Sequence, residues 1–158
     1  MSNSIADITS VRQSAQRTWG YGFNLEQAVS EDIGLFARWS WHPGNYETQT
    51  VDISRSLSGG VSIKGTNWSR PSDTVGLGFA LNGLAQSQIT YLQQGGISPF
   101  IGDGKLNYKK EQIFESYYSA KIYKDLVLTV DFQRIANPAY NASRGPVNIL
   151  GIRAHIEI

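Results

Sequence analysis

Cysteine is absent from this chain of 158 residues, so neither disulfides nor thiolate metal sites can form. Neither sign of charge is in excess, because the chain has 14 Lys and Arg and 13 Asp and Glu. This balance gives no indication of a basic patch that would bind nucleic acid. No apolar run approaches the about 20 residues of a membrane-spanning helix. Residues 1–17 are polar and contain no apolar stretch, so we expect no export signal within them. If the chain contacts a membrane, it must do so through strands.

Glycine and aromatic residues are plentiful, with 16 Gly and 8 Tyr, and this mixture favours strands and turns over helices. Apolar and polar residues alternate in several segments, as in a sheet with one buried face. In the third such segment Arg55 falls among the apolar positions, which predicts a bulge or a strand end there. The predicted strands are 19–29, 33–41, 51–65, 74–84, 111–123, 126–135 and 147–158.

The longest predicted connection, 85–110, contains a stretch compatible with a short helix. This stretch is 86–94, and Gly95, Gly96 and Pro99 would end it.

Three features favour lipid over a protein core as the partner of the apolar stripes. The segments hold about 9–11 alternating residues, the length of a tilted transmembrane strand, whereas soluble strands usually hold about 5–6. No other part of the chain supplies a second layer that could cover the apolar faces. Aromatic residues lie toward the segment ends, as in the interfacial girdles of outer-membrane barrels; they are Trp19, Tyr21, Trp39, Trp41, Tyr118 and Tyr123.

The predicted connections also alternate in length, with long ones on one side of the sheet and short ones on the other. The sequence places 42–49, 85–110 and 136–146 on one side, and 30–32, 66–73 and 124–125 on the other. Outer-membrane barrels pair longer external loops with short periplasmic turns. The exception is that 66–73 is as long as 42–49.

Several stretches resemble the carbohydrate-selective porins of the OprB family. They include "WSRPSD" (68–73), "IGDGKLNYKKEQIFESYYS" and "IANPAYNASRGPVNILGIRAHIEI", and the similarity runs from about Tyr21 to the end. The resemblance implies an all-β, antiparallel, up-and-down transmembrane barrel of about sixteen strands. It implies passive, carbohydrate-selective transport across the Gram-negative outer membrane, and hence sugars, outer-membrane lipid, lipopolysaccharide and the barrel assembly machinery as partners.

Two departures from that family accompany the resemblance. The chain ends in Ile158 where outer-membrane barrels usually end in Phe. Seven strands are also too few to close a wide barrel. We therefore interpret residues 1–17 as the remnant of an external loop and 18–158 as one incomplete domain, the C-terminal part of a larger porin.

The polar stripes would line the path of the sugar. Hydrogen-bonding groups replace the water that a sugar loses, while Phe36 and Tyr117 offer rings for stacking. The predicted pore-lining residues are Asn24, Glu26, Arg38, Ser40, Lys64, Asn82, Glu115, Tyr117, Lys121, Asp131, Gln133, Arg153 and Glu157.

Enzymatic interpretations of these residues are weaker. Glu115 and Asp131 could imitate a glycosidase pair, and His155 between Arg153 and Glu157 could suggest a metal or catalytic group. Mixed charges on a pore wall explain both without chemistry, so we expect no enzyme, cofactor or metal. The main alternative is a soluble β-sandwich or small β-barrel that binds carbohydrate.

Overall fold

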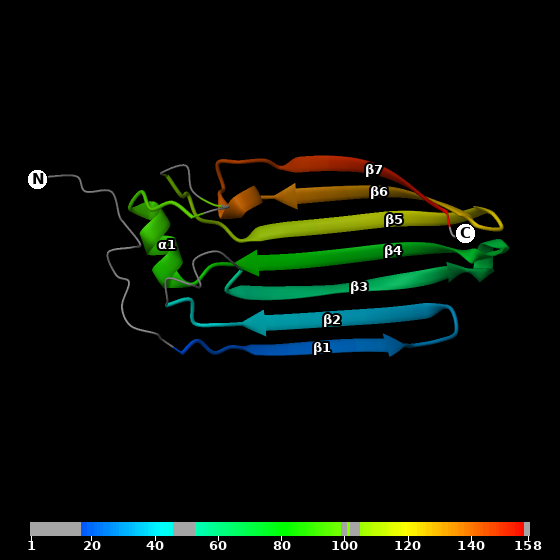
Figure 1. The fold of residues 1–158 in the computed structure, drawn as a ribbon, viewed down its shortest axis with the longest axis horizontal. Helices are drawn as coiled ribbons and strands as arrows, with labels where there is room; N and C mark the ends of the chain where they lie inside the picture. Colours follow the sequence, from blue (N-terminus) through cyan, green and yellow to red (C-terminus); the bar gives the residue numbers. More distant parts are fainter. Residues whose placement is uncertain (1–16, 46–52, 99–100, 102–104, 157–158) are drawn as a thin grey trace, which may run out of the picture.

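The computed structural model describes residues 17–45, 53–98, 101 and 105–156. Seven antiparallel strands form one sheet in which each strand pairs with its neighbours in the chain, as an up-and-down topology requires (Figure 1). The strands are β1 (Tyr21–Ala28), β2 (Ile33–Trp41), β3 (Arg55–Gly65), β4 (Arg70–Gly83), β5 (Glu111–Tyr123), β6 (Leu126–Ala136) and β7 (Val147–Ile156). The predicted all-β antiparallel fold is confirmed. No helix in the described part of the chain is long and apolar enough to cross a membrane.

The predicted strand bounds hold for β2 and β5 and fail at the start of β4. Strand β4 begins at Arg70, not at residue 74, so the connection before it is shorter than predicted. A 3-10 helix, Thr66–Trp68, and Ser69 in the left-handed region at φ 62° make that connection. The sequence predicted a strand from residue 51 with a bulge or a strand end near Arg55; β3 begins at Arg55, and residues 53 and 54 lie outside it, so the structure has the strand end. The difference in length between the two sets of connections is therefore sharper than the sequence suggested.

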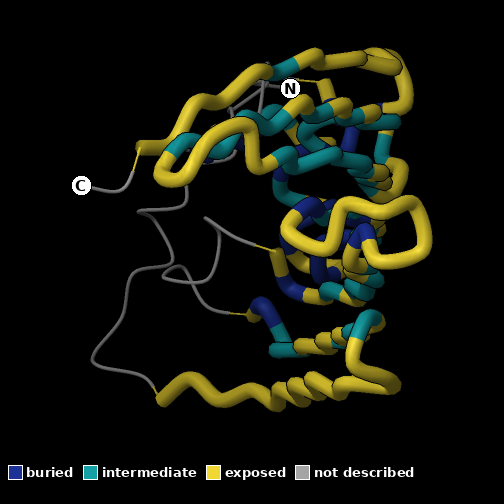
Figure 2. The backbone as a smooth tube through the Cα atoms, turned by 90° about the vertical axis from the view of Figure 1, so that its right-hand side faces the viewer, coloured by how far each residue is buried: buried dark blue, intermediate teal, exposed yellow. Residues whose placement is uncertain are grey.

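The sheet is a curved wall with two unlike faces. In Figure 2 the strands follow an arc that opens to one side. Pairing aligns like side chains across the strands, so that Phe23, Trp39, Leu57 and Leu81 form one row of the convex face. Their neighbours in sequence point to the concave face, because successive side chains alternate in a strand.

The convex face has no protein layer over it within the described residues. Leu150 and Ile152 are each 74% exposed and Tyr21 is 64% exposed. Exposed apolar area this continuous is unusual for a soluble monomer and marks an interaction surface.

Buried apolar side chains gather instead at one end of the sheet, which we call the loop end. This end carries the long connections 42–54, 84–110 and 137–146, and the helix α1 (Gln86–Gln93) lies there beyond the strands (Figure 1). The predicted short helix is thus confirmed. The small core of the loop end comprises Leu84, Ile89, Leu92, Ile101, Leu106 and Tyr140.

The "ANPAYN" stretch ties the β6–β7 connection to the residues before β5. The Asn137 amide donates to the Lys110 carbonyl at 2.9 Å, and the Asn141 amide donates to the Lys105 carbonyl at 3.1 Å. Tyr140 between them is 5% exposed and belongs to the loop-end core. The asparagines therefore satisfy backbone carbonyls that the irregular loop would otherwise leave unpaired.

The opposite end, which we call the turn end, is held by Asp73 from the "WSRPSD" stretch. Its carboxylate is 1% exposed and receives the Arg70 guanidinium, the Tyr118 hydroxyl at 2.6 Å and the Lys121 amide at 3.0 Å. Arg70 also donates to the Lys121 carbonyl at 3.2 Å, and Trp68 donates its indole N–H to the Tyr118 oxygen at 3.2 Å. These contacts hold the start of β4 against β5, which is why β4 extends beyond its alternating segment.

Candidate functional site

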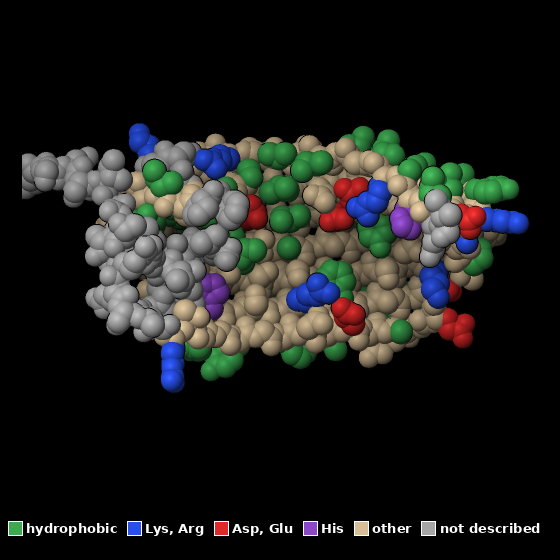
Figure 3. Space-filling view, in the orientation of Figure 1, with side chains coloured by type: hydrophobic (Ala, Val, Ile, Leu, Met, Phe, Trp, Pro, Cys, Tyr) green, Lys and Arg blue, Asp and Glu red, His purple; other side chains and the backbone are tan. Residues whose placement is uncertain are grey.

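The concave face gathers the predicted pore-lining residues. The strand registers place them on this one side of the sheet, and Figure 3, which views that side, shows acidic and basic side chains in the middle of the hollow. Glu157 lies outside the described residues. The residues brought together on the concave face are Asn24, Glu26, Arg38, Ser40, Lys64, Asn82, Glu115, Tyr117, Lys121, Asp131, Gln133 and Arg153.

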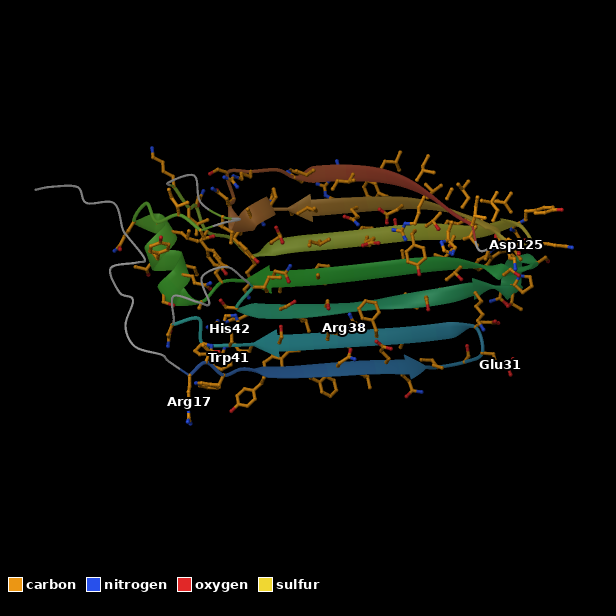
Figure 4. The ribbon with its side chains drawn as sticks, in the orientation of Figure 1. Arg17, Glu31, Arg38, Trp41, His42 and Asp125 are labelled. Atoms are coloured by element: carbon orange, nitrogen blue, oxygen red, sulfur yellow. The ribbon has the colours of Figure 1, made fainter. Side chains whose placement is uncertain are left out.

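Arg38 on β2 is the centre of the first polar group, midway along the sheet (Figure 4). Its guanidinium lies 3.0 Å from a carboxylate oxygen of Glu26 and 3.0 Å from the side-chain oxygen of Asn24, both on β1. It also lies 5.4 Å from the centre of the Phe36 ring. The Arg38 and Glu26 side chains are 58% and 63% exposed, so the pair adds little to stability. Its remaining donors and acceptors are open to a solute.

Two aromatic rings of the concave face lie over glycines of a neighbouring strand. A Cβ added to Gly60 would approach the Phe36 ring to 2.5 Å, and one added to Gly76 would approach the Tyr117 ring to 2.1 Å. Phe36 pairs with Gly60 and Gly76 pairs with Tyr117 in the register. The glycines leave room for each ring to lie across the sheet, which presents the ring face toward the hollow.

The second polar group spans β5, β6 and β7. The Gln133 amide donates to Glu115 at 3.2 Å, and Asp131 pairs with Gly151 in the register. Arg153 lies two positions along β7 from Gly151 and therefore on the same face. The acids Glu115 on β5 and Asp131 on β6 thus share the concave side with the base Arg153 on β7. Among the described residues no group of three His, Cys, Asp or Glu side chains is placed to hold a metal ion.

Asn82 differs from the other predicted residues because it is buried and its side chain is hydrogen-bonded to protein partners. It is 5% exposed, and its amide group accepts from Ser56 at 2.9 Å and donates to Glu111 at 3.4 Å. Glu111 was not among the predicted residues, although its spacing of four from Glu115 places both side chains on the same face. Its second oxygen accepts the Ala139 N–H at 2.9 Å, so Glu111 joins the wall to the loop end.

An aliphatic strip on the concave face was not predicted from the sequence. Ile113, Ile135 and Val147 form one row across β5, β6 and β7, and Ile149 lies two residues further along β7. Val147 and Ile149 are 41% and 43% exposed. The inner stripe is therefore not uniformly polar near the loop end of these strands. Alternation alone did not reveal the strip, because β5 to β7 have apolar residues on both faces there.

Comparisons with known proteins agree with this geometry. The family model described as carbohydrate-selective porin, OprB family, matches residues 2–158. The high-pH structure of Pseudomonas putida OprB superimposes with a TM-score of 0.71 at 17% sequence identity. The superposition covers 88% of this chain and 35% of that chain, and at this identity it supports the shared fold alone. A search of curated proteins finds no match.

Proposed function

Because the chain belongs to the carbohydrate-selective porin family OprB, we propose that its sheet is part of the wall of an outer-membrane channel for sugars. The family is one of channels, not of enzymes. In this proposal the convex face contacts lipid and the concave face lines the aqueous path. Outer-membrane lipid, lipopolysaccharide and the barrel assembly machinery are the further partners that such a placement implies.

The observation that carries the proposal is the opposite character of the two faces. Phe79, Leu150 and Ile152 represent a convex face that is apolar and exposed, while Arg38 and Glu26 represent a concave face that is charged and hollow. A soluble carbohydrate-binding sandwich would need a second layer over the convex face, and the described residues supply none. The aligned apolar rows fit a hydrocarbon solvent.

The two edge strands of the sheet indicate how the wall of the channel would be closed. Within the described residues β1 and β7 each pair on one side only. An open edge in lipid leaves N–H and C=O groups without partners at a cost of several kcal/mol each, by rough estimate. We propose that strands beyond the described sheet close the barrel.

Transport would rely on weak and reversible contacts. The polar group around Arg38 and the group around Glu115 and Arg153 offer hydrogen bonds that replace water around a sugar. Phe36 and Tyr117 offer ring faces. None of these groups forms an enclosed site, and tight binding would slow release.

The test is sugar flux through channels that contain this sheet, measured by liposome swelling. Arg38→Ala and Arg153→Ala should each lower the rate for a sugar relative to a less polar neutral solute of similar size by about fivefold, the equivalent of one lost hydrogen bond. For Arg38→Ala the change in folding free energy should stay under about 0.5 kcal/mol, because the ion pair is exposed.

Lys124→Ala is the matched control, because Lys124 is an exposed cation in the turn between β5 and β6. It should leave the sugar rate unchanged. Sugar rates that are equal to wild type in both arginine variants would contradict the proposed role of the concave face.

A further inference from the structure

Gly78 lies inside β4 on the concave face, and nothing in the described part of the protein requires a glycine there. A Cβ added to Gly78 would find no heavy atom within 4 Å. Its φ lies outside the left-handed region, so the backbone would accept a residue with a side chain without strain. Among the glycines of the described strands, Gly78 is the one beside which the space is open in this way.

A glycine inside a strand lowers stability, because it loses more backbone freedom on folding and packs no side chain. Such a glycine usually marks a bulge, a sharp bend, or a place where a ligand or another backbone approaches closely. The registers of β4 with β3 and with β5 run without a shift across Gly78, so it marks no bulge. Figure 1 shows β4 without a sharp bend along its length. The close approach of another group is the reason that remains.

The two glycines next to Gly78 have a different reason to lack a side chain. Gly60 on β3 and Gly76 on β4 lie beneath the rings of Phe36 and Tyr117, which an added Cβ would approach to 2.5 Å and 2.1 Å. Gly78 pairs with Gly60 across the sheet, and it lies two residues from Gly76 on the same face. Gly78 is therefore an uncovered part of the wall that adjoins both rings.

The groups around Gly78 match the chemistry of a sugar ring. On its other side Gly78 pairs with Glu115 of β5, whose carboxylate accepts the Gln133 amide at 3.2 Å. A carboxylate can accept several hydrogen bonds, and sugar hydroxyls can donate them. The C–H faces of a sugar ring are apolar and can lie against Phe36 or Tyr117. A sugar that lies over Gly78 thus has both kinds of contact within reach.

We propose that Gly78 sets the width of the sugar path at this level of the wall, because its missing side chain leaves room for a sugar ring beside Phe36 and Tyr117. This inference rests on the proposed function, since it takes the concave face to line the path. A side chain at position 78 would fill that room and hinder a larger sugar more than a smaller one. Gly78 is then a specificity-determining residue that selects by size, whereas Arg38 and Arg153 act through hydrogen bonds.

Liposome swelling with a disaccharide and with a monosaccharide tests this inference in channels that contain the sheet. Gly78→Gln should lower the disaccharide rate relative to the monosaccharide rate by about fivefold, less than one surplus methylene costs in an enclosed pocket, because the path is open on one side. Gly78→Ala adds only a methyl group and should stay within about twofold of wild type. Neither variant should raise the unfolding equilibrium constant, because the open space and the backbone accept a side chain.

Gly22→Gln is the matched control, because it adds the same side chain to the same face away from both rings. Gly22 pairs with Ser40 on the concave face, and an added Cβ would lie 3.8 Å from the Trp39 carbonyl oxygen, an ordinary contact. This variant should leave the ratio of the two sugar rates unchanged.

Three results would overturn the inference. They are a wild-type ratio of sugar rates in Gly78→Gln, an equal loss in Gly22→Gln, and a rise of about tenfold or more in the unfolding equilibrium constant of Gly78→Gln. The third would show that another part of the protein packs against Gly78. A wild-type ratio in Gly78→Gln together with lowered sugar rates in Arg38→Ala would leave the proposed function standing. Unchanged sugar rates in the two arginine variants would instead contradict the proposed function.

Discussion

Arginine in place of Ile152 is expected to destabilise the folded protein by about 2–4 kcal/mol, the cost of a cation at mid-depth on the lipid face of a barrel. Ile152 is 74% exposed on the convex face, in the central part of β7. In water such a substitution would be nearly neutral, because an exposed side chain gives up no packing. Urea unfolding in phospholipid vesicles gives the free energy directly.

Gly151 is the matched control, since it is the adjacent residue and its side chain would point to the concave face. A Cβ there would lie 3.6 Å from an Asp131 carboxylate oxygen, an ordinary contact. Gly151→Arg places the new cation beside an acid in the aqueous hollow and should change stability by less than about 1 kcal/mol. Equal destabilisation by the two variants would contradict the assignment of the faces.

The second large effect is expected at the turn end, where Asp73→Asn should raise the unfolding equilibrium constant by about a hundredfold. The asparagine side chain would have one neutral acceptor oxygen in place of the two charged carboxylate oxygens. It would still face the donors of Arg70, Tyr118 and Lys121. Arg70 would also lose its counter-charge. The same vesicle unfolding experiment measures the change.

Asp125→Asn provides the comparison for Asp73, because Asp125 is exposed in the β5–β6 turn. It should shift unfolding less than about twofold. Tyr118→Phe, which removes one donor from the Asp73 carboxylate, should fall between the two at about tenfold. An Asp73 variant that unfolds like the Asp125 variant would show that the carboxylate does not hold the turn.

The local alternation of apolar and polar residues was sufficient to predict the bounds of strands that no distant residue extends. Strands β2 and β5 begin and end as the apolar period predicts, and Arg55 marks a strand end as its position suggested. The period could not give the start of β4, because Arg70 and Asp73 are held by hydrogen bonds with Lys121 on β5, which lies far away in sequence. A single segment of sequence contains no sign of such a partner.

The features of the site that were not predicted from the sequence are those that depend on the cross-strand register. Phe36 and Tyr117 could be placed on the inner stripe from their positions, but the glycines beneath them, Gly60 and Gly76, become visible only when strands are aligned. The aliphatic strip that includes Ile113 and the engagement of Asn82 by its neighbours have the same origin. The pore-lining role of the concave residues stays a prediction.

The two faces of the sheet should meet different solvents, with lipid on the convex face and water on the concave face. Spin labels on single cysteines test it most directly, and the absence of native cysteine makes every label unique. Labels at Val130 and Phe132 should collide mainly with oxygen, which concentrates in lipid, whereas labels at Asp131 and Gln133 should collide mainly with a water-soluble nickel complex. This two-residue alternation along β6 is the expected result. Nickel access at all four positions, or labels at Val130 and Phe132 shielded from both reagents, would contradict it.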